Sequence, residues 1–240
     1  MERRRKVKLE RAWLLSPSVR SLVLRTLDGG PIDYEAGQYI DVIVPTARGL
    51  AFRRSYSIAS APDAGRPGEI EIAVTRVPGG PTSEALHALS AGAFLEIEGP
   101  RGAFLRRAAD RERPALFVAA GTGLAPIRAM LAKEVSAAHG APLVLLFGCR
   151  TLDDVLWGED LAAWGRSCAR LAVHVTLSRP PPLWDGLAGY VQLHAVRLAR
   201  SLPGCIAYVC GLTAMVDAVV ATLGRDAGLP SDAIRFETYD

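Results

Sequence analysis

The chain has 240 residues, of which 50% are hydrophobic and 22% are charged. This balance excludes an intrinsically disordered segment and indicates a folded protein with a buried core. The formal net charge is +3, which fits either an ordinary solvated surface or a basic face that attracts an acidic partner. No nucleic acid-binding motif accompanies this charge.

The sequence shows no sign of membrane insertion or export. No apolar run approaches the ~18 residues of a membrane span. Residues 7–20 interrupt their apolar positions with charges, unlike the apolar region of a signal peptide. We therefore expect a cytoplasmic protein that binds neither membranes nor nucleic acid.

The cysteines and histidines do not predict a metal centre. The four cysteines, at 149, 168, 205 and 210, form no C-x-x-C pair. Cys205 and Cys210 have the spacing that opens a plant-type iron–sulfur motif, but that motif needs a further cysteine where this chain has Thr213. The four histidines are scattered. We expect no metal, no iron–sulfur cluster and no disulfide.

Residues 7–105 predict an antiparallel β-barrel domain. Short runs of alternating apolar and polar residues, separated by Gly and Pro, indicate strands at 19–24, 39–44, 69–77 and 94–98. One helix is expected at 83–89. The polar segment 106–113 precedes Pro114, so we expect one domain over 1–112 and a second over 113–240.

The second half predicts an α/β domain. Apolar strands at 115–120, 143–147, 171–177 and 206–209 alternate with helical patterns at 127–139, 153–165, 192–201 and 214–224. This alternation is typical of a parallel sheet covered by helices on both faces. Ligands of such sheets bind at the carboxyl ends of the strands.

Two short strings carry chemistry. G-T-G-L-A-P at 121–126 follows a strand and opens a helix, where glycines allow close approach and the helix amino end attracts phosphate; a simple tight turn is the alternative. R-S-Y-S at 54–57 offers a cation, a flat ring and a hydroxyl on extended chain. Taken alone, it is equally an exposed strand end with an incidental tyrosine.

Together with C-G-L-T-A-M at 210–215 and F-E-T-Y at 236–239, these strings resemble the ferredoxin–NADP reductase family of flavoproteins. The resemblance extends from about Val7 to Tyr239. It implies an FAD-binding β-barrel followed by an NADP(H)-binding α/β domain.

The resemblance assigns the flavin contacts to two strings. R-x-Y-S is the family's flavin motif, which implies a phosphate contact from Arg54, stacking of Tyr56 on the isoalloxazine ring and a hydrogen bond from Ser57 near flavin N5. G-P-T-S at 80–83 is similar to the family's pyrophosphate cradle. The remaining implied flavin contacts are Ser55, Gly80, Thr82 and Ser83.

The resemblance also assigns the coenzyme contacts. A Ser-Arg pair, here Ser178 and Arg179, holds the 2′-phosphate in NADPH-using members. A phosphate monoester carries about −1.5 to −2 charge and suits a bidentate guanidinium. The alternative is that Arg179 is only a solvated charge before the prolines at 180–182. The other implied coenzyme residues are Gly121, Thr122, Gly123, Ala125, Pro126, Arg150, Tyr190, Gln192 and Gly211.

Four residues are implied around the hydride transfer itself. They are Ser57, Cys210 beside the nicotinamide, Glu237, and Tyr239 on the flavin face opposite Tyr56. A ring at 239 must move before nicotinamide can stack there. Plant-type members end on this Tyr, whereas here Asp240 adds a carboxylate after it.

The resemblance implies an NADPH-dependent enzyme of the ferredoxin–NADP(+) reductase type. It passes hydride from NADPH to FAD and single electrons to a ferredoxin or flavodoxin. We expect a monomer whose contact with this carrier is transient and electrostatic. Open alternatives are a reductase component of an oxygenase system, a diaphorase or flavin reductase with small acceptors, and a non-catalytic electron-transfer subunit.

Overall fold

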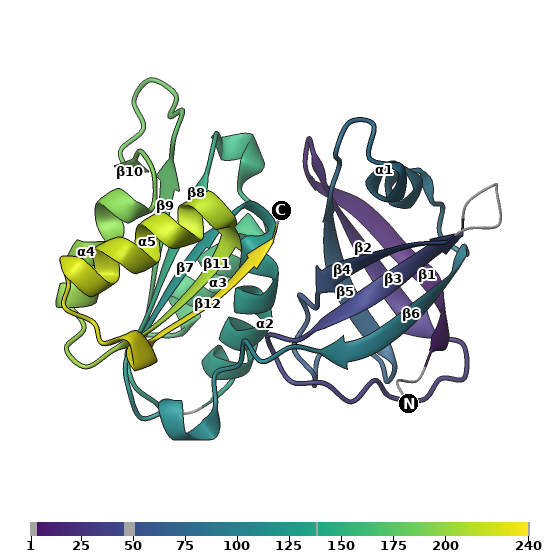
Figure 1. The fold of residues 1–240 in the computed structure, drawn as a ribbon, viewed down its shortest axis with the longest axis horizontal. Coiled ribbons are helices and arrows are strands. Elements are labelled where there is room, and N and C mark those ends of the chain that lie inside the picture. The colour runs from purple at the N-terminus through teal and green to yellow at the C-terminus, as the bar shows by residue number, and fades with distance from the viewer. Residues whose placement is uncertain (1–3, 46–50, 138, 240) are drawn as a thin grey trace.

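The computed structural model describes residues 4–45, 51–137 and 139–239. Asp240, and with it the expected effect of its carboxylate on Tyr239, lies outside the described residues. The chain forms two lobes side by side, with the end of the last strand at the junction between them (Figure 1). Among the described residues, no helix combines the length and apolar character needed to cross a membrane.

The first lobe is the expected antiparallel β-barrel. Its six strands follow the order β4-β3-β6-β1-β2-β5, and an antiparallel bridge between Ile58 and Ile72 brings the two edges of the sheet together. Alternating apolar residues fill the interior, where Leu22, Ile40 and Ile72 are fully buried. The elements are β1 (Arg5–Ser16), β2 (Val19–Thr26), β3 (Tyr39–Pro45), β4 (Ala51–Ser57), β5 (Glu69–Thr75), α1 (Pro81–Ala88) and β6 (Phe94–Arg101).

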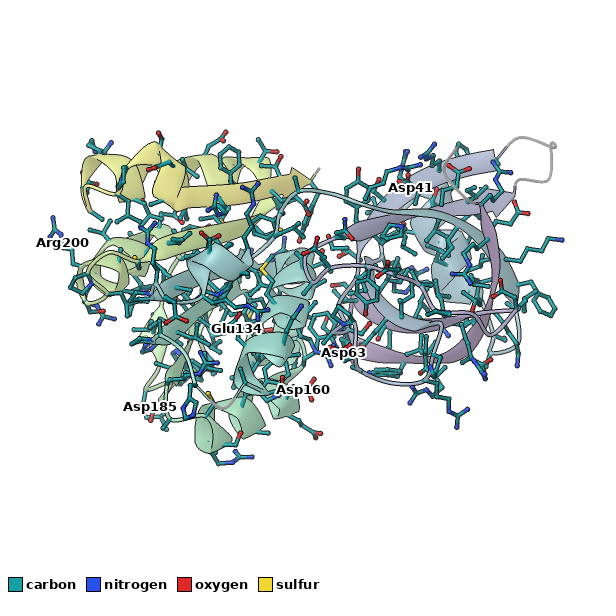
Figure 2. All side chains as sticks on the ribbon, turned by 90° about the horizontal axis from the view of Figure 1, so that it is seen from below. Asp41, Asp63, Glu134, Asp160, Asp185 and Arg200 are labelled. Carbon is teal, nitrogen blue, oxygen red and sulfur yellow. The ribbon has the colours of Figure 1, made fainter. Side chains whose placement is uncertain are left out.

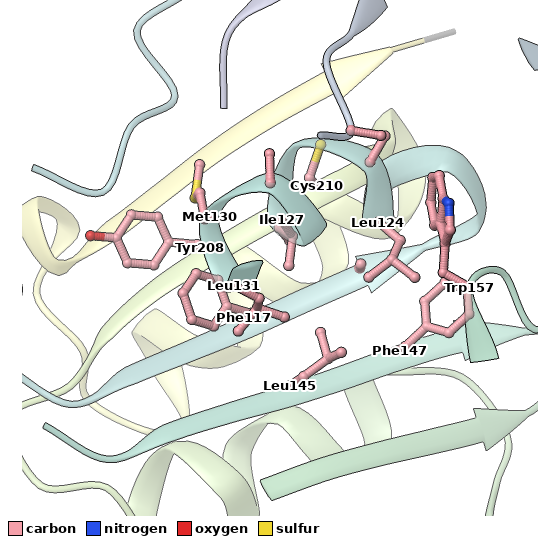
Figure 3. Packing of buried hydrophobic residues seen from close by; sticks show 14 of the residues in the cluster. Phe117, Leu124, Ile127, Met130, Leu131, Leu145, Phe147, Trp157, Tyr208 and Cys210 are labelled. Carbon is pink, nitrogen blue, oxygen red and sulfur yellow. The ribbon is translucent and has the colours of Figure 1, made fainter. Parts of the chain in front are cut away.

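The second lobe is the expected parallel sheet, in the order β10-β9-β8-β7-β11-β12. Each neighbouring pair is parallel. Helices α2 and α3 pack on one face and α4 and α5 on the other. Figure 3 shows the residues of α2 that pack on the first face, among them Leu124 and Ile127. The elements are β7 (Ala115–Ala120), α2 (Leu124–Val135), β8 (Leu143–Cys149), α3 (Gly158–Ser167), β9 (Leu171–Leu177), β10 (Leu187–Ala188), α4 (Gln192–Arg200), β11 (Ile206–Leu212), α5 (Thr213–Arg225) and β12 (Ile234–Tyr239).

The two lobes share part of one core. The apolar cluster on the α2 face of the parallel sheet also includes barrel residues. These are Val19, Ala36, Ala59, Ala73 and Phe104. Such continuous packing fixes how the lobes meet, because close-packed interiors tolerate little displacement.

Several element bounds differ from the sequence prediction. The pattern at 153–165 predicts one helix, but the structure has a 3₁₀ turn, Leu152–Asp154, and then α3 from Gly158. Trp157 between them has φ 48, which interrupts the helical backbone. Strands β1 and β12 were not predicted, since their charged and half-exposed residues mask the alternation.

Candidate functional site

The last strand brings three predicted site residues together. β12 pairs in parallel with β11, so that Glu237 lies directly opposite Cys210. Across the lobe junction, the Ser57 hydroxyl at the end of β4 donates a hydrogen bond to Glu237 Oε1 at 3.4 Å. A hydroxyl of the barrel thereby meets a carboxylate 180 residues further along the chain.

Burial sets the protonation behaviour of these groups. It raises the pKa of Glu237, and the hydrogen bond from Ser57 partly opposes this rise. Burial, reinforced by the negative charge of Glu237, also raises the pKa of the Cys210 thiol. Cys210 is therefore a neutral thiol at physiological pH, and Glu237 holds a proton more readily than an exposed carboxyl.

The two predicted stacking tyrosines belong to different lobes. Tyr56, half-buried on β4, packs against the barrel core, whereas Tyr239 packs against the core of the second lobe. The Tyr239 hydroxyl is buried beside the side chains of Thr122 and Cys210. Burial raises the pKa of Tyr239 well above its ordinary value, so the phenol stays neutral.

The glycine loop, residues 121–123, packs so tightly against β11 that no side chain fits at Gly123. It follows β7 and forms a 3₁₀ turn, Gly121–Gly123, directly before α2. A Cβ at position 123 would lie 2.2 Å from the carbonyl oxygen of Cys210. Gly121 has φ +54 and open space around its missing side chain, so this side of the loop is free for a ligand to approach.

The remaining residues of this string have different surroundings. Ala125 and Pro126 are buried in the first turn of α2, and Gly211 is buried near the end of β11. The Thr122 hydroxyl faces the barrel, 3.4 Å from that of Thr75 at the end of β5. The loop is thus fixed between the sheet and the barrel, with one open face.

The predicted flavin contacts of the barrel lie on β4 and at the start of α1. The Arg54 side chain is exposed, and its Nη1 donates a hydrogen bond to the carbonyl of its neighbour Arg53 at 3.1 Å. Gly80 precedes α1, and no side chain caps this helix end, which leaves its amides available to a phosphate. An arginine and an uncapped helix end fit the phosphates of a dinucleotide.

Of the three hydroxyl residues in these strings, Ser55 is exposed but bonded within the barrel, and the other two are buried. Ser55 donates to Asp41 Oδ1 at 2.5 Å. Ser83 is buried and bonds with the backbone of Val77 and Gly80, while Thr82 is also buried. These side chains shape the loops around the site.

The predicted 2′-phosphate residues meet at the carboxyl ends of β8 and β9. The Arg179 amide donates to the Arg150 carbonyl at 2.8 Å, and the Ser178 amide to that of Cys149 at 3.0 Å. Arg150, Arg179 and Tyr190 are exposed, and Gln192 is half-buried at the start of α4. Neither arginine forms an ion pair within the described part of the chain, so both guanidiniums are available to a phosphate.

Residues that the sequence analysis did not single out also shape the junction. Thr75 contacts the glycine loop, and Glu71 and Arg128 pair across the lobes at 3.1 Å. Glu71 looks like an ordinary polar position of an alternating strand, and Arg128 like one of many surface arginines. No pattern in the sequence distinguishes them.

Two family models match nearly the whole chain. Residues 6–105 match the oxidoreductase FAD-binding domain, and residues 117–221 match the oxidoreductase NAD-binding domain. Among solved structures, the cytochrome P450 reductase GcoB of Amycolatopsis has a TM-score of 0.88 at 26% identity, over 99% of this chain and 70% of that one. The fold expected from the sequence is therefore confirmed.

Curated relatives agree with these domains. Ferredoxin–NADP reductase B of Sorangium cellulosum is 41% identical over 94% of this chain and 93% of its own length. The ferredoxin–NAD(+) reductase component of the alkene monooxygenase system of Xanthobacter autotrophicus is 35% identical over 94% of this chain and 67% of its own length. The chain therefore belongs to the ferredoxin–NADP reductase family.

Proposed function

We propose that this protein is an NADPH-dependent flavoprotein reductase that delivers electrons to a ferredoxin or flavodoxin. The observation that carries this proposal is the meeting of Ser57, Cys210 and Glu237 at the junction of an FAD-binding and a NAD-binding domain. The domains divide at the polar segment before Pro114, as 1–112 and 113–240.

The geometry supports specific residues for each cofactor. Arg54, the open end of α1 and the ring of Tyr56 are suited to the FAD. The open face of the glycine loop and the pair Arg150 and Arg179 are suited to NADP(H). The other residues in these roles are Ser55, Ser57, Gly80, Thr82, Ser83, Thr122, Gly123, Ala125, Pro126, Ser178, Tyr190, Gln192, Gly211 and Tyr239.

The protein positions the reacting groups and controls protons. When bound, FAD accepts a hydride from NADPH and releases its electrons singly. The Ser57 hydroxyl can donate either to Glu237, as it does here, or to a ligand beside it. Glu237, with its raised pKa, can hold a proton at its carboxyl near this hydroxyl. Cys210, a buried neutral thiol, offers a small polarizable surface without charge.

The electron acceptor is proposed from the family. The Sorangium relative is named a ferredoxin–NADP reductase and the Xanthobacter relative a ferredoxin–NAD(+) reductase component. We propose a transient, electrostatically steered encounter with a small acidic carrier, a monomeric enzyme, and a cytoplasmic location.

One experiment tests the core of the proposal. The purified protein should show a flavin absorbance spectrum, and stopped-flow mixing with NADPH should bleach it faster than NADH does. Ferredoxin should then be reduced under steady-state NADPH. A bound flavin that neither coenzyme bleaches would refute the proposal, and bleaching without electron transfer to any ferredoxin or flavodoxin would instead support a diaphorase.

A reductase component of an oxygenase system is the second candidate. It is favoured by relatives named as such components, including the naphthalene 1,2-dioxygenase/salicylate 5-hydroxylase reductase of Ralstonia, 34% identical over 81% of this chain and 58% of its own length. Reconstitution with separate oxygenase and ferredoxin components distinguishes it from a general ferredoxin reductase.

A further inference from the structure

A polar cluster built around the buried residues Glu71 and Trp157 joins the two lobes away from Glu237. At its centre, the Glu71 carboxylate of β5 accepts hydrogen bonds from Trp157 Nε1 at 2.9 Å and Arg128 Nη1 at 3.1 Å, both of the second lobe. Ser21 in β2 donates to the same carboxylate at 2.6 Å. The carboxylate is thus held from both lobes. We call Glu71, Arg128, Trp157 and Asp160 the interdomain clamp.

Arg128 uses most of its donors within this clamp. Its Nε and Nη2 donate to Asp160 Oδ2 at 3.0 and 2.6 Å, and Nη1 also donates to the Ala59 carbonyl of the barrel at 2.8 Å. Its guanidinium carbon lies 4.9 Å from the centroid of the Trp157 ring. The side chains of Arg128 and Glu71 are only 16% and 11% exposed. Charge-assisted bonds from a planar fork are directional, so the clamp favours one placement of the lobes.

The interdomain clamp lies outside the candidate redox site. It forms part of the wall of a groove of about 710 Å³ that Trp13 and Trp164 also line, whereas Ser57 and Glu237 do not. Figure 2 shows Asp160 and Asp63 at the junction of the lobes, well away from the end of β12. The clamp residues therefore do not touch the proposed reacting groups.

Two rigid elements connect the clamp to that site. Strand β5 runs from Glu71 to Thr75, a distance of roughly 13 Å at strand spacing, and α2 runs back from Arg128 to the glycine loop, roughly 6 Å along the helix to its first residue. Their far ends meet where the hydroxyls of Thr75 and Thr122 lie 3.4 Å apart. A shift of Arg128 relative to Glu71 would thus displace the glycine loop relative to the end of β5.

We infer that the interdomain clamp aligns the coenzyme loop with the flavin half of the site, so that Glu71 and Arg128 are positioning residues for hydride transfer. The inference rests on the proposed function, because it assigns the loop to the coenzyme. A broken clamp leaves each cofactor's own contacts intact. Breaking the clamp then lowers the rate of hydride transfer, while NADPH affinity and flavin content stay unchanged.

The test compares four variants of the flavin-loaded protein: Arg128→Gln, Arg128→Lys, Glu71→Gln and Arg11→Gln. Arg128→Gln removes the guanidinium, and Glu71→Gln keeps the side-chain shape should Arg128→Gln fold poorly. Arg11→Gln is the matched control, because the Arg11–Glu69 pair (2.5 Å) lies in the same groove and on the same strand β5 but joins only barrel strands. Stopped-flow reduction gives the limiting transfer rate and the NADPH Kd, and amide hydrogen exchange reports the order of residues 121–125.

We expect both clamp variants to lower the limiting rate on the order of 100-fold, the usual consequence of a misplacement of about 1 Å, with an unchanged Kd. Exchange at 121–125 should accelerate, Arg11→Gln should behave as wild type, and Arg128→Lys should recover part of the rate. The inference is overturned if the clamp variants match Arg11→Gln, or if only Kd changes. Should NADPH fail to reduce wild type, the proposed function fails, while the exchange comparison still tests the ordering of the loop by the clamp.

Discussion

The substitution Gly123→Ala probes how closely the glycine loop packs on the sheet. Gly123 has φ −58 and ψ −15, a helical conformation that alanine adopts readily. The added Cβ, however, would lie 2.2 Å from the Cys210 carbonyl oxygen and 2.6 Å from its carbon. Any penalty is therefore steric, and backbone strain plays no part in it.

The geometry sets the expected magnitude. Ordinary contact begins near 3.4 Å, so the loop or β11 must move by about 1 Å, and overpacking of this kind costs about 1–3 kcal/mol. Cys210 lies opposite Glu237, so the same movement disturbs the site. A displacement of about 1 Å lowers hydride transfer on the order of 100-fold.

Urea unfolding and stopped-flow reduction by NADPH measure these two effects. Gly224→Ala in α5 is the control, because its Cβ meets nothing within 4 Å and alanine should raise helix stability by roughly 0.5–1 kcal/mol. A Gly123→Ala protein with wild-type unfolding free energy and transfer rate would refute the packing argument.

Three further predictions concern the site. Burial raises the pKa of Glu237 above 4.5, so the free energy of unfolding of the wild type falls as pH rises from 4.5 through the folded pKa. Urea unfolding from pH 4 to 8 should show that Glu237→Gln gains stability relative to the wild type over that window. Parallel stability curves for the two proteins would contradict this. Tyr239→Ser should tighten nicotinamide binding and weaken the preference for NADPH over NADH, as measured by coenzyme titration, because no ring then has to move; unchanged affinity and preference would count against stacking there. Arg179→Gln should reduce the NADPH preference about ten- to a hundredfold, seen in kcat/KM for both coenzymes, whereas Arg166→Gln on α3 should leave it unchanged.

Much of this fold could be predicted from the sequence because its signals are local. Alternating residues in the first half and apolar strands between helices in the second predict both sheets, and the β7 and β11 runs fall at the predicted positions. The break between Leu152 and Gly158 could not be predicted, because the helical pattern continues through it. The extended backbone at Val155 and the left-handed backbone at Trp157, whose indole binds Glu71 of the other lobe, interrupt it.

The candidate site likewise has features that the sequence predicts and features that only the tertiary structure reveals. The sequence by itself determined which residues are proposed to carry the chemistry, since G-T-G-L-A-P, R-S-Y-S and F-E-T-Y are contiguous strings that resemble the family's motifs. The tertiary structure alone decided that Glu237 meets Ser57 and Cys210, because this depends on the parallel pairing of β12 with β11 and on the docking of the lobes. It also revealed the ion pair between Glu71 and Arg128, two residues that lie 57 positions apart in the sequence. Contacts between distant residues depend on packing, which leaves no periodic pattern in either segment.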